Sequence, residues 1–242
     1  EKIFKTIERV KDSDFPVLIT GESGVGKELI ARAIHYSGVR SKEPFFAENC
    51  GAFTETLLES ELFGYVRGAF TGAVSDRMGI FELAGDGTIF LDEIGEMNND
   101  TQKRFLRVIQ EKEVRRVGGD KLIKVNSRVI CATNRDLSKM IADGTFREDL
   151  YYRLSVIEIN VPPLRERRED IPLLIRHFIK KHEKGEAREF SKGLVEYFKK
   201  YNWPGNIREL ENDVVRLLTL SDNVIIDEKD LAENRMMDIE MR

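Results

Sequence analysis

The sequence predicts an α/β fold in which helices flank a parallel sheet, followed by a small all-α domain. Three observations support this prediction. Short apolar runs alternate with helical patterns through the first two thirds of the chain, and a glycine-rich segment joins the first run to a helix. The pair Pro162-Pro163 ends this alternation, and the pattern after it is helical. We therefore expect one domain over residues 1–164 and a second over 165–242.

Five short apolar runs are the predicted strands. They are apolar on both faces, which is typical of the central strands of a parallel sheet. The runs cover residues 15–20, 44–47, 88–91, 128–132 and 156–161.

Helical patterns fill the segments between the strands and most of the second domain. Asn99 or Asp100 is the expected N-cap of the third helix, and Ser191 is the expected cap of a later one. Strands that alternate with helices form parallel sheets with right-handed crossovers. The predicted helices cover 27–37, 55–63, 100–112 and 137–153, and then lie around 171–178, 194–201 and 207–217.

The composition limits the classes of function. The chain has 242 residues, of which 41% are hydrophobic and 34% charged, and its net charge of −4 argues against duplex DNA binding by this segment. No apolar run approaches the roughly 18 residues of a membrane span, and no signal peptide opens the chain. We therefore expect a cytoplasmic protein with no membrane contact, in which Cys50 and Cys131 are buried thiols. Glu1 is not an initiator methionine, so we expect either a domain excised from a longer protein or a processed product.

Residues 21–28 read GESGVGKE and match the phosphate-binding pattern G-x-x-x-x-G-K between a strand and a helix. Glycines let backbone N–H groups converge on phosphate oxygens, and the helix N-terminus adds positive potential. We expect Lys27 to reach the β- and γ-phosphates. Glu28 stands where Ser or Thr usually holds Mg²⁺, so the metal should depend on another carboxylate or on water. The predicted nucleotide-binding residues of this loop are Gly21, Glu22, Ser23, Gly24, Val25, Gly26, Lys27 and Glu28.

Two carboxylates end the apolar run in TIFLDE, at residues 88–93. We expect Asp92 to bind Mg²⁺ and Glu93 to orient or polarise the attacking water. Alone, the two motifs are compatible with a glycine turn and with the acidic start of a helix. Their order and spacing together predict a site for ATP or GTP.

Three further polar residues belong to the predicted hydrolytic site. Asn134 follows the fourth apolar run and is placed to hold the γ-phosphate or the water. Arg147 and Arg153, six residues apart in FREDLYYRL, would point about 120° apart on one helix, so we expect one or both to act in trans as arginine fingers. The alternative is a pair of solvated arginines bound to Glu148 or Asp149.

Residues 68–73 read GAFTGA, a small uncharged hexapeptide with a single aromatic residue between flexible glycines. An exposed aromatic on a mobile loop is unfavourable for stability but well suited to anchor a partner. The alternative is that Phe70 packs into its own subunit. Gly118-Gly119 predicts a hairpin turn near the same face.

With these motifs in order, the chain resembles the AAA+ ATPase domain of bacterial enhancer-binding proteins, the sigma-54-dependent activators of the nitrogen regulatory protein C type. GAFTGA resembles their signature loop. The resemblance covers nearly the whole chain, and its other supporting stretches are GESGVGKELIARAIH, LLESELFGY, GTIFLDEIGE, ATNRDL, FREDLYYRL, PPLRERRED and WPGNIRELEN.

The resemblance implies a P-loop NTPase fold, Mg²⁺-dependent ATP hydrolysis and a hexameric or heptameric ring that remodels the closed complex of sigma-54 RNA polymerase. Asn49 would be a switch residue that bonds Glu93, and Arg208 a sensor that contacts the nucleotide. A Glu in the position of Glu28 is usual in the family. The residues implied to contact sigma-54 are Gly68, Ala69, Phe70, Thr71, Gly72 and Ala73.

Family members of the two-component type usually carry a regulatory domain before this module and a DNA-binding helix-turn-helix after it. Few residues precede the first predicted strand, and 220–242 is short for a DNA reader, so we expect enhancer DNA to be bound only through a domain absent from this chain. Three other readings stay open: a P-loop kinase of a small metabolite, a passive nucleotide-dependent scaffold, and a different AAA+ remodeller. A kinase would have no role for GAFTGA, and a different AAA+ remodeller would lack this hexapeptide. A passive scaffold would not need Glu93.

Overall fold

The computed structural model describes residues 2–182 and 188–231, which form two compact units. One unit contains the chain up to Gly21 together with Lys27–Val161. The other contains Glu22–Gly26 together with the chain from Pro162 onward. The boundary between the two units therefore crosses the chain three times: before and after residues 22–26 of the phosphate-binding loop, and after the last strand of the sheet.

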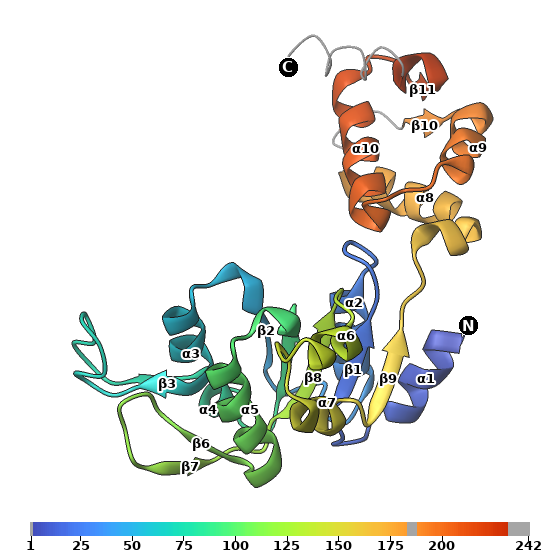
Figure 1. Cartoon of the computed structure of the whole chain (residues 1–242). Coiled ribbons are helices and arrows are strands. Elements are labelled where there is room, and N and C mark those ends of the chain that lie inside the picture. The colour runs from blue at the N-terminus through green and yellow to red at the C-terminus, as the bar shows by residue number, and fades with distance from the viewer. Residues whose placement is uncertain (1, 183–187, 232–242) are drawn as a thin grey trace. The chain divides into compact units, whose positions relative to one another are not determined.

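A five-stranded parallel sheet is the centre of the first unit (Figure 1). Its order is β2-β5-β8-β1-β9, and every pair of neighbours is parallel, so all carboxyl ends meet at one edge. Ligands of open α/β sheets bind at that edge. All five predicted strands are present, as β1 (Val17–Thr20), β2 (Phe45–Asn49), β5 (Thr88–Asp92), β8 (Arg128–Thr133) and β9 (Ile157–Asn160).

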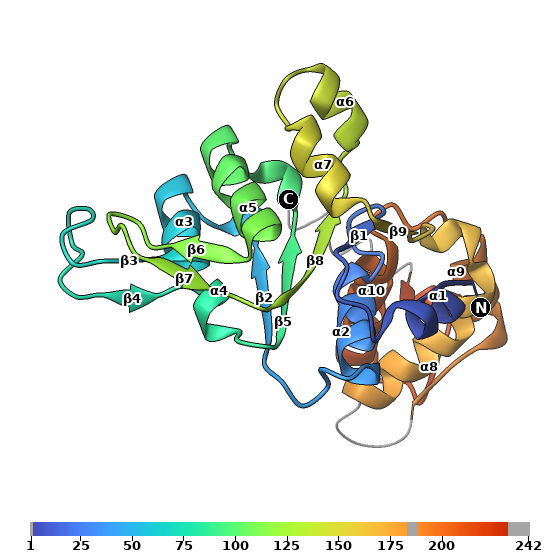
Figure 2. The same cartoon turned by 90° about the horizontal axis from the view of Figure 1, so that it is seen from below.

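Helices cover both faces of this sheet (Figure 2). Ile89 and Leu91 of β5 point into a core with Phe81 and Phe105, while Phe90 between them is buried on the opposite face. On that opposite face α2 (Lys27–Ser37) packs on β5 and β8, and α1 (Lys2–Val10) packs on α2. The helices of the first face are α3 (Glu55–Phe63), α4 (Ile80–Leu83), α5 (Asn99–Glu111), α6 (Leu137–Ala142) and α7 (Glu148–Leu154).

Two details of the predicted helices are wrong. Residues 137–153 do not form one helix, because the chain turns between α6 and α7 at Gly144, whose φ of 70° lies in the left-handed region that ends helices. The N-cap of α5 is Asn98, whose side chain accepts a hydrogen bond from Thr101 N at 2.7 Å, and not Asn99 or Asp100.

Two antiparallel hairpins extend from the first unit beside one another (Figure 1). One pairs β3 (Gly64–Tyr65) with β4 (Arg77–Met78), and its loop carries GAFTGA. The other pairs β6 (Glu113–Arg115) with β7 (Leu122–Lys124) and contains the predicted turn at Gly118, where φ is 74°. The hairpins are joined by hydrogen bonds from Val66 N to Val117 O (3.1 Å) and from Val117 N to Gly64 O (2.8 Å).

The second unit is mainly helical. Its helices surround Trp203, which is fully buried and donates its indole N–H to Phe198 O at 2.7 Å. Ser191 caps the middle helix as predicted, whereas the short pair of β10 (Glu189–Phe190) and β11 (Ile225–Ile226) is not predicted by the helical pattern. The helices are α8 (Ile171–His182), α9 (Lys192–Lys200) and α10 (Asn206–Leu220).

Across the described ranges of both units, every helix falls short of the length and apolar character that a bilayer crossing requires.

Candidate functional site

Lys27 is the first residue of α2, directly after the glycine-rich loop that follows β1. Its side chain is almost fully buried, and its Nζ donates to Gly21 O at 2.9 Å. Gly24 and Gly26 have φ values of 77° and 95°, a backbone conformation that side chains other than glycine rarely tolerate. The glycines of the motif are therefore required by the shape of the loop, and a cation is held at the carboxyl end of β1.

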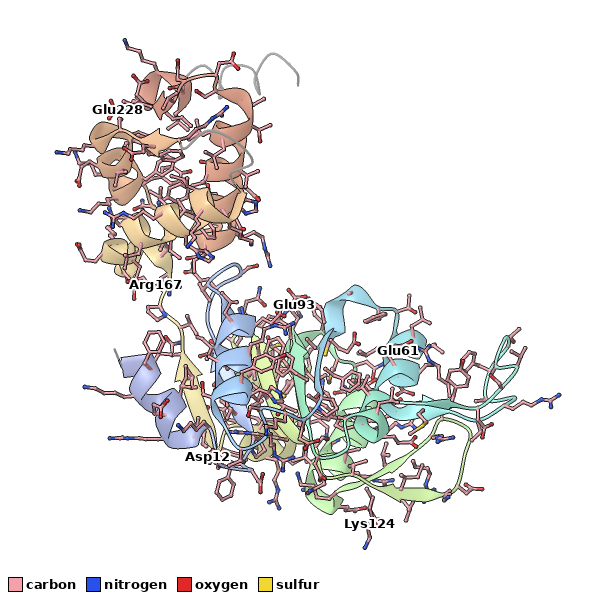
Figure 3. All side chains as sticks on the ribbon, turned by 180° about the vertical axis from the view of Figure 1, so that it is seen from behind. Asp12, Glu61, Glu93, Lys124, Arg167 and Glu228 are labelled. Atoms are coloured by element: carbon pink, nitrogen blue, oxygen red, sulfur yellow. The ribbon has the colours of Figure 1, made fainter. Side chains whose placement is uncertain are left out.

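Asp92 and Glu93 lie at the same edge of the sheet, where β5 ends; Glu93 is labelled in Figure 3. Burial raises the pKa of Asp92 above its ordinary value, while a hydrogen bond from Glu93 N at 2.9 Å and the charge of Lys27 act against this shift. Glu93 has φ 54° and ψ 44°. Left-handed backbone in a residue other than glycine costs on the order of 1–3 kcal/mol and is concentrated at functional sites. Both acids thus occupy energetically unfavourable environments at this edge of the sheet.

Asn49 ends β2 and is paired in register with Asp92. Its Oδ1 accepts from Gly51 N at 2.7 Å and so caps the short helical turn Cys50–Ala52. A Cβ on Gly51 would lie 2.6 Å from Glu93 Oε2 and 3.3 Å from Asn49 Oδ1. The amide and the carboxylate therefore both lie next to Gly51, although within the described residues the hydrogen bond of the Asn49 side chain is to Gly51 and not to Glu93.

Asn134 follows β8, the neighbour of both β5 and β1, and is exposed at the same edge of the sheet. The end of β8 is tied to the start of the phosphate-binding loop by a hydrogen bond from Gly21 N to Thr133 O at 3.3 Å. The structure thus brings five predicted residues to one edge of the first unit: Lys27, Asn49, Asp92, Glu93 and Asn134.

The two predicted finger arginines differ in environment. Arg147 precedes α7 in extended conformation, so the 120° separation derived for one continuous helix does not apply to it. Its guanidinium forms an ion pair with Asp149 at 2.6 Å, which is the pairing that the alternative interpretation predicts, and it lowers the pKa of Asp149. Arg153 lies exposed in the last turn of α7.

Glu28 lies on the exposed side of α2 and forms an ion pair with Arg32, one turn later, at 2.7 Å. This contact directs the carboxylate along the helix. The ion pair with Arg32 therefore explains the orientation of the Glu28 side chain, and no metal is needed to explain it.

In the second unit, Arg208 lies against the phosphate-binding loop. Its Nη1 donates to Ser23 Oγ at 3.2 Å. Other contacts of the same loop segment involve Arg165, Arg167 and Asn206, which the sequence analysis does not single out. The only signal for them is that they stand inside two of the quoted stretches, PPLRERRED and WPGNIRELEN.

The GAFTGA loop closes on itself through hydrogen bonds from Gly68 N to Ala73 O (2.9 Å) and from Ala73 N to Phe70 O (3.0 Å). Phe70 is half-buried, and its ring lies edge-on to Tyr65 with centroids 4.9 Å apart. Thr71 is exposed at the tip. In this conformation Phe70 packs on its own subunit, which is the alternative stated for it.

Arg116 connects the bases of the two hairpins. Its guanidinium binds Glu82 of α4 through two hydrogen bonds of 2.7 Å and lies 3.7 Å from Asp76. Asp76 in turn accepts from Arg67 N at 2.9 Å. The position of the GAFTGA loop is therefore coupled to α4 by charged contacts.

Comparison with known proteins identifies this arrangement. Residues 1–160 match the sigma-54 interaction domain, and residues 165–238 match the AAA+ ATPase lid domain. This chain belongs to the sigma-54 interaction domain family. The sigma-54 interaction domain is the AAA+ ATPase module of regulators that activate transcription, so the predicted family, fold class and enzyme class are confirmed.

Two curated relatives illustrate the family. The chain is 51% identical to the regulatory protein AtoC of Escherichia coli (strain K12) over 232 residues, covering 95% of this chain and 50% of AtoC. It is 48% identical to the DNA-binding transcriptional regulator NtrC of Rhizobium meliloti (strain 1021), covering 98% and 49% of the two chains. This sigma-54 interaction domain thus spans about half the length of the curated relatives it matches.

Solved structures agree in fold. NtrX from Brucella abortus in complex with ADP superposes with a TM-score of 0.88 at 39% identity, covering 95% of this chain and 52% of NtrX. Hsp104 superposes with a TM-score of 0.64 at 17% identity over 90% of this chain and 44% of its own, which shows a shared fold alone.

Proposed function

We propose that this domain binds ATP with Mg²⁺, hydrolyses it within a ring of identical subunits, and remodels the closed complex of sigma-54 RNA polymerase through the GAFTGA loop. One observation carries the proposal. Lys27, Asp92 and Glu93 converge at the carboxyl edge of a parallel sheet, in the unit that also bears the GAFTGA hairpin. A phosphate-binding cation, a buried aspartate and a glutamate with a strained backbone suit hydrolysis. The hairpin suits transmission of the resulting conformational change to sigma-54.

Each residue at the edge has a proposed role. The loop amides and Lys27 bind phosphate, and Lys27 exchanges its bond to Gly21 O for one to the nucleotide. Glu93 orients the attacking water and accepts its proton, and Asn134 holds the water or the γ-phosphate. Asn49 reports the nucleotide state by moving its amide from Gly51 to Glu93. The known NtrX structures in complex with ATP and with ADP support nucleotide binding here.

The residues present fit Mg²⁺. A carboxylate oxygen is the hard ligand that this ion prefers, and a bound cation would offset the burial that raises the pKa of Asp92. Among the described residues no group of three or more His, Cys, Asp or Glu gathers into a metal site, so phosphate and water would complete the coordination. The ion would supply charge stabilisation at the phosphates.

The remaining roles concern the lid and the assembly. We assign residues 1–164 to the nucleotide-binding domain and 165–242 to the lid, with Arg208 contacting the nucleotide from the lid. Arg153, exposed on α7, and Arg147, once released from Asp149, act on the site of the neighbouring subunit. Phe70 and Thr71 contact sigma-54 after Phe70 leaves Tyr65. Activation of bacterial transcription implies a cytoplasmic location.

Phosphate release from the purified chain, measured with and without sigma-54, tests this proposal. We expect ATP-dependent release without any small-molecule acceptor, and nucleotide-dependent capture of sigma-54 in the presence of ADP and aluminium fluoride. Release that requires an added metabolite would indicate a kinase instead. Sigma-54 capture without any turnover would indicate a passive scaffold.

A further inference from the structure

The phosphate-binding loop is fixed through its carbonyl groups by the second unit. The carbonyl oxygens of three consecutive residues each accept a hydrogen bond from it. Ser23 O accepts from Asn206 Nδ2 (3.0 Å), Gly24 O from Ile207 N (3.0 Å) and Val25 O from Arg167 Nη2 (2.8 Å). These partners all come from the chain after Pro162, and Arg167 is labelled in Figure 3.

This pattern sets the direction of the loop amides. In a planar trans peptide the C=O and the following N–H point in opposite directions. Fixing the carbonyls of residues 23–25 therefore turns the N–H groups of Gly24, Val25 and Gly26 away from their lid partners. These are the amides that the glycine-rich motif offers to phosphate.

Asn206, which bonds Ser23 O, is held in a fixed position by its surroundings. It is fully buried and has a φ of 55°, a conformation that asparagine tolerates better than most residues. Its Oδ1 accepts from Leu164 N at 2.8 Å, and its Nδ2 also donates to Glu22 Oε2 at 3.1 Å. One amide thus joins the chain after the sheet, the phosphate-binding loop and the start of α10.

A second clamp holds the beginning of the loop. Both terminal nitrogens of Arg165 bind the Glu22 carboxylate, at 2.6 and 2.9 Å. This pairing and the Asn206 bond lower the pKa of Glu22 to about 2. Close packing adds to these bonds, because a Cβ on Gly24 would lie 2.3 Å from Gly205 O.

We propose that Arg167 and Asn206 are positioning residues for phosphate binding: by bonding the carbonyls of the loop, they hold its amides in the orientation that accepts a nucleoside di- or triphosphate. The proposal rests on the proposed ATP binding. It differs from the role of Arg208, whose Nη1 bonds the Ser23 hydroxyl and not a loop carbonyl. The state of the lid then sets nucleotide affinity through the loop backbone.

The test compares Arg167→Met with Arg168→Met in the full chain. Methionine keeps the aliphatic stem but removes the donors. Arg168 is the matched control, because among the described residues its guanidinium bonds Arg165 O, Lys199 O, Lys200 O and Asn202 Oδ1, all after Pro162, and no residue of the phosphate-binding loop. Dissociation constants for fluorescent ATP and ADP analogues, kcat at saturating ATP and thermal unfolding are measured for each.

We expect Arg167→Met to raise the dissociation constants of both nucleotides about tenfold, the loss of one charged hydrogen bond, with kcat retained at saturation. Arg168→Met should leave both constants at the parent value. Arg167→Lys should restore part of the affinity because it keeps a donor. Asn206→Gly, which tolerates the positive φ but lacks the amide, should repeat the result if Arg167→Met folds poorly.

Equal affinity in the parent and in both loop variants would overturn the inference, as would an equal loss in Arg168→Met. A loss confined to ATP would also overturn it, because a reoriented loop must weaken ADP too. A parent chain that binds neither nucleotide would instead refute the proposed function itself.

Discussion

Glu93 combines a left-handed backbone with a carboxylate that lies 2.6 Å from the position a Cβ on Gly51 would take. Asparagine or glycine would adopt the same backbone at lower cost than glutamate does. Its neighbour Asp92 bears a burial cost of a similar kind, which raises its pKa. At the scale of single residues, the edge of the sheet therefore carries two acids in energetically unfavourable environments, which is typical of functional sites.

Glu93→Gln should leave ATP affinity close to the parent value and lower kcat by about 10²-fold or more, because the amide cannot accept the proton of the water. Affinity is measured by titration with a fluorescent analogue and kcat by phosphate release. Glu111→Gln, on the exposed end of α5, serves as the control. If affinity falls as far as turnover does, Glu93 is a metal ligand or a structural residue.

Lys27→Ala should lose ATP affinity itself, by about 10- to 100-fold, because a charged hydrogen bond to phosphate disappears. Equilibrium binding to the full chain is the measurement. Lys103→Ala is the matched control, because it also removes a lysine but breaks only a surface ion pair with Asp100. Unchanged affinity in Lys27→Ala would remove the basis for assigning the loop to phosphate.

At the scale of elements, the GAFTGA hairpin is a closed loop on a charged base. Its tip is held by backbone bonds and by the contact between Phe70 and Tyr65, while Arg116 links its base to α4 and the second hairpin. A loop with few apolar contacts of its own can change position at low cost. Release of the Phe70 side chain therefore requires the loss of its contact with Tyr65, whereas movement of the whole tip also breaks the backbone hydrogen bond between Ala73 N and Phe70 O.

Phe70→Ala should keep ATP binding, assembly and basal hydrolysis but lose capture of sigma-54 with ADP and aluminium fluoride. Burial of one aromatic ring at a partner contributes on the order of 1.5–3 kcal/mol, so capture should weaken by about tenfold or more. Thr71→Ala should act in the same direction if its hydroxyl supports the raised loop.

Val74→Ala is the control for this experiment, because Val74 lies in the same loop and its side chain is 81% exposed. Undiminished capture by Phe70→Ala would show that the loop is not the contact. Equal loss in Val74→Ala would indicate a general effect on loop conformation.

The elements also show which parts of the fold are predictable. The strands of the sheet are buried on both faces, so their apolar runs stand out in the sequence. The strands β3 and β4 of the GAFTGA hairpin could not be predicted in this way, because they contain two residues each and much of their surface is exposed, whereas the turn of the second hairpin was indicated by Gly118-Gly119. The turn at Gly144 was missed because the helical pattern continues on both sides of it.

The candidate site divides in the same manner. Lys27, Asp92, Glu93 and Asn134 directly follow loops or strands that the pattern locates, so their convergence follows from a parallel sheet. The bond between Ser23 and Asn206 joins residues that are far apart in the sequence, and no local pattern encodes it. The ion pair between Arg147 and Asp149 joins residues two positions apart, so the sequence could offer it as an alternative to a finger in trans.

At the scale of the whole molecule, activity should belong to the assembly. If Arg153 serves a neighbouring site, specific activity per chain rises with protein concentration and reaches a plateau. Mixing Lys27→Ala with Arg153→Ala chains should restore part of the hydrolysis, because some interfaces then contain an intact loop facing an intact arginine. Analytical ultracentrifugation of the same mixtures establishes that they assemble. Absence of recovery at every ratio in assembled mixtures would count against a finger in trans.

The grouping of Glu22–Gly26 with the second unit also decides how this protein can be divided. A fragment that begins at Pro162 would carry Asn206 and Ile207 without the carbonyls that they bond. Each buried polar group left unpaired costs about 1–3 kcal/mol, so such a fragment should be less stable than its apolar core suggests. The lid therefore cannot be exchanged between relatives on its own, because the exchange must also include the five residues Glu22–Gly26.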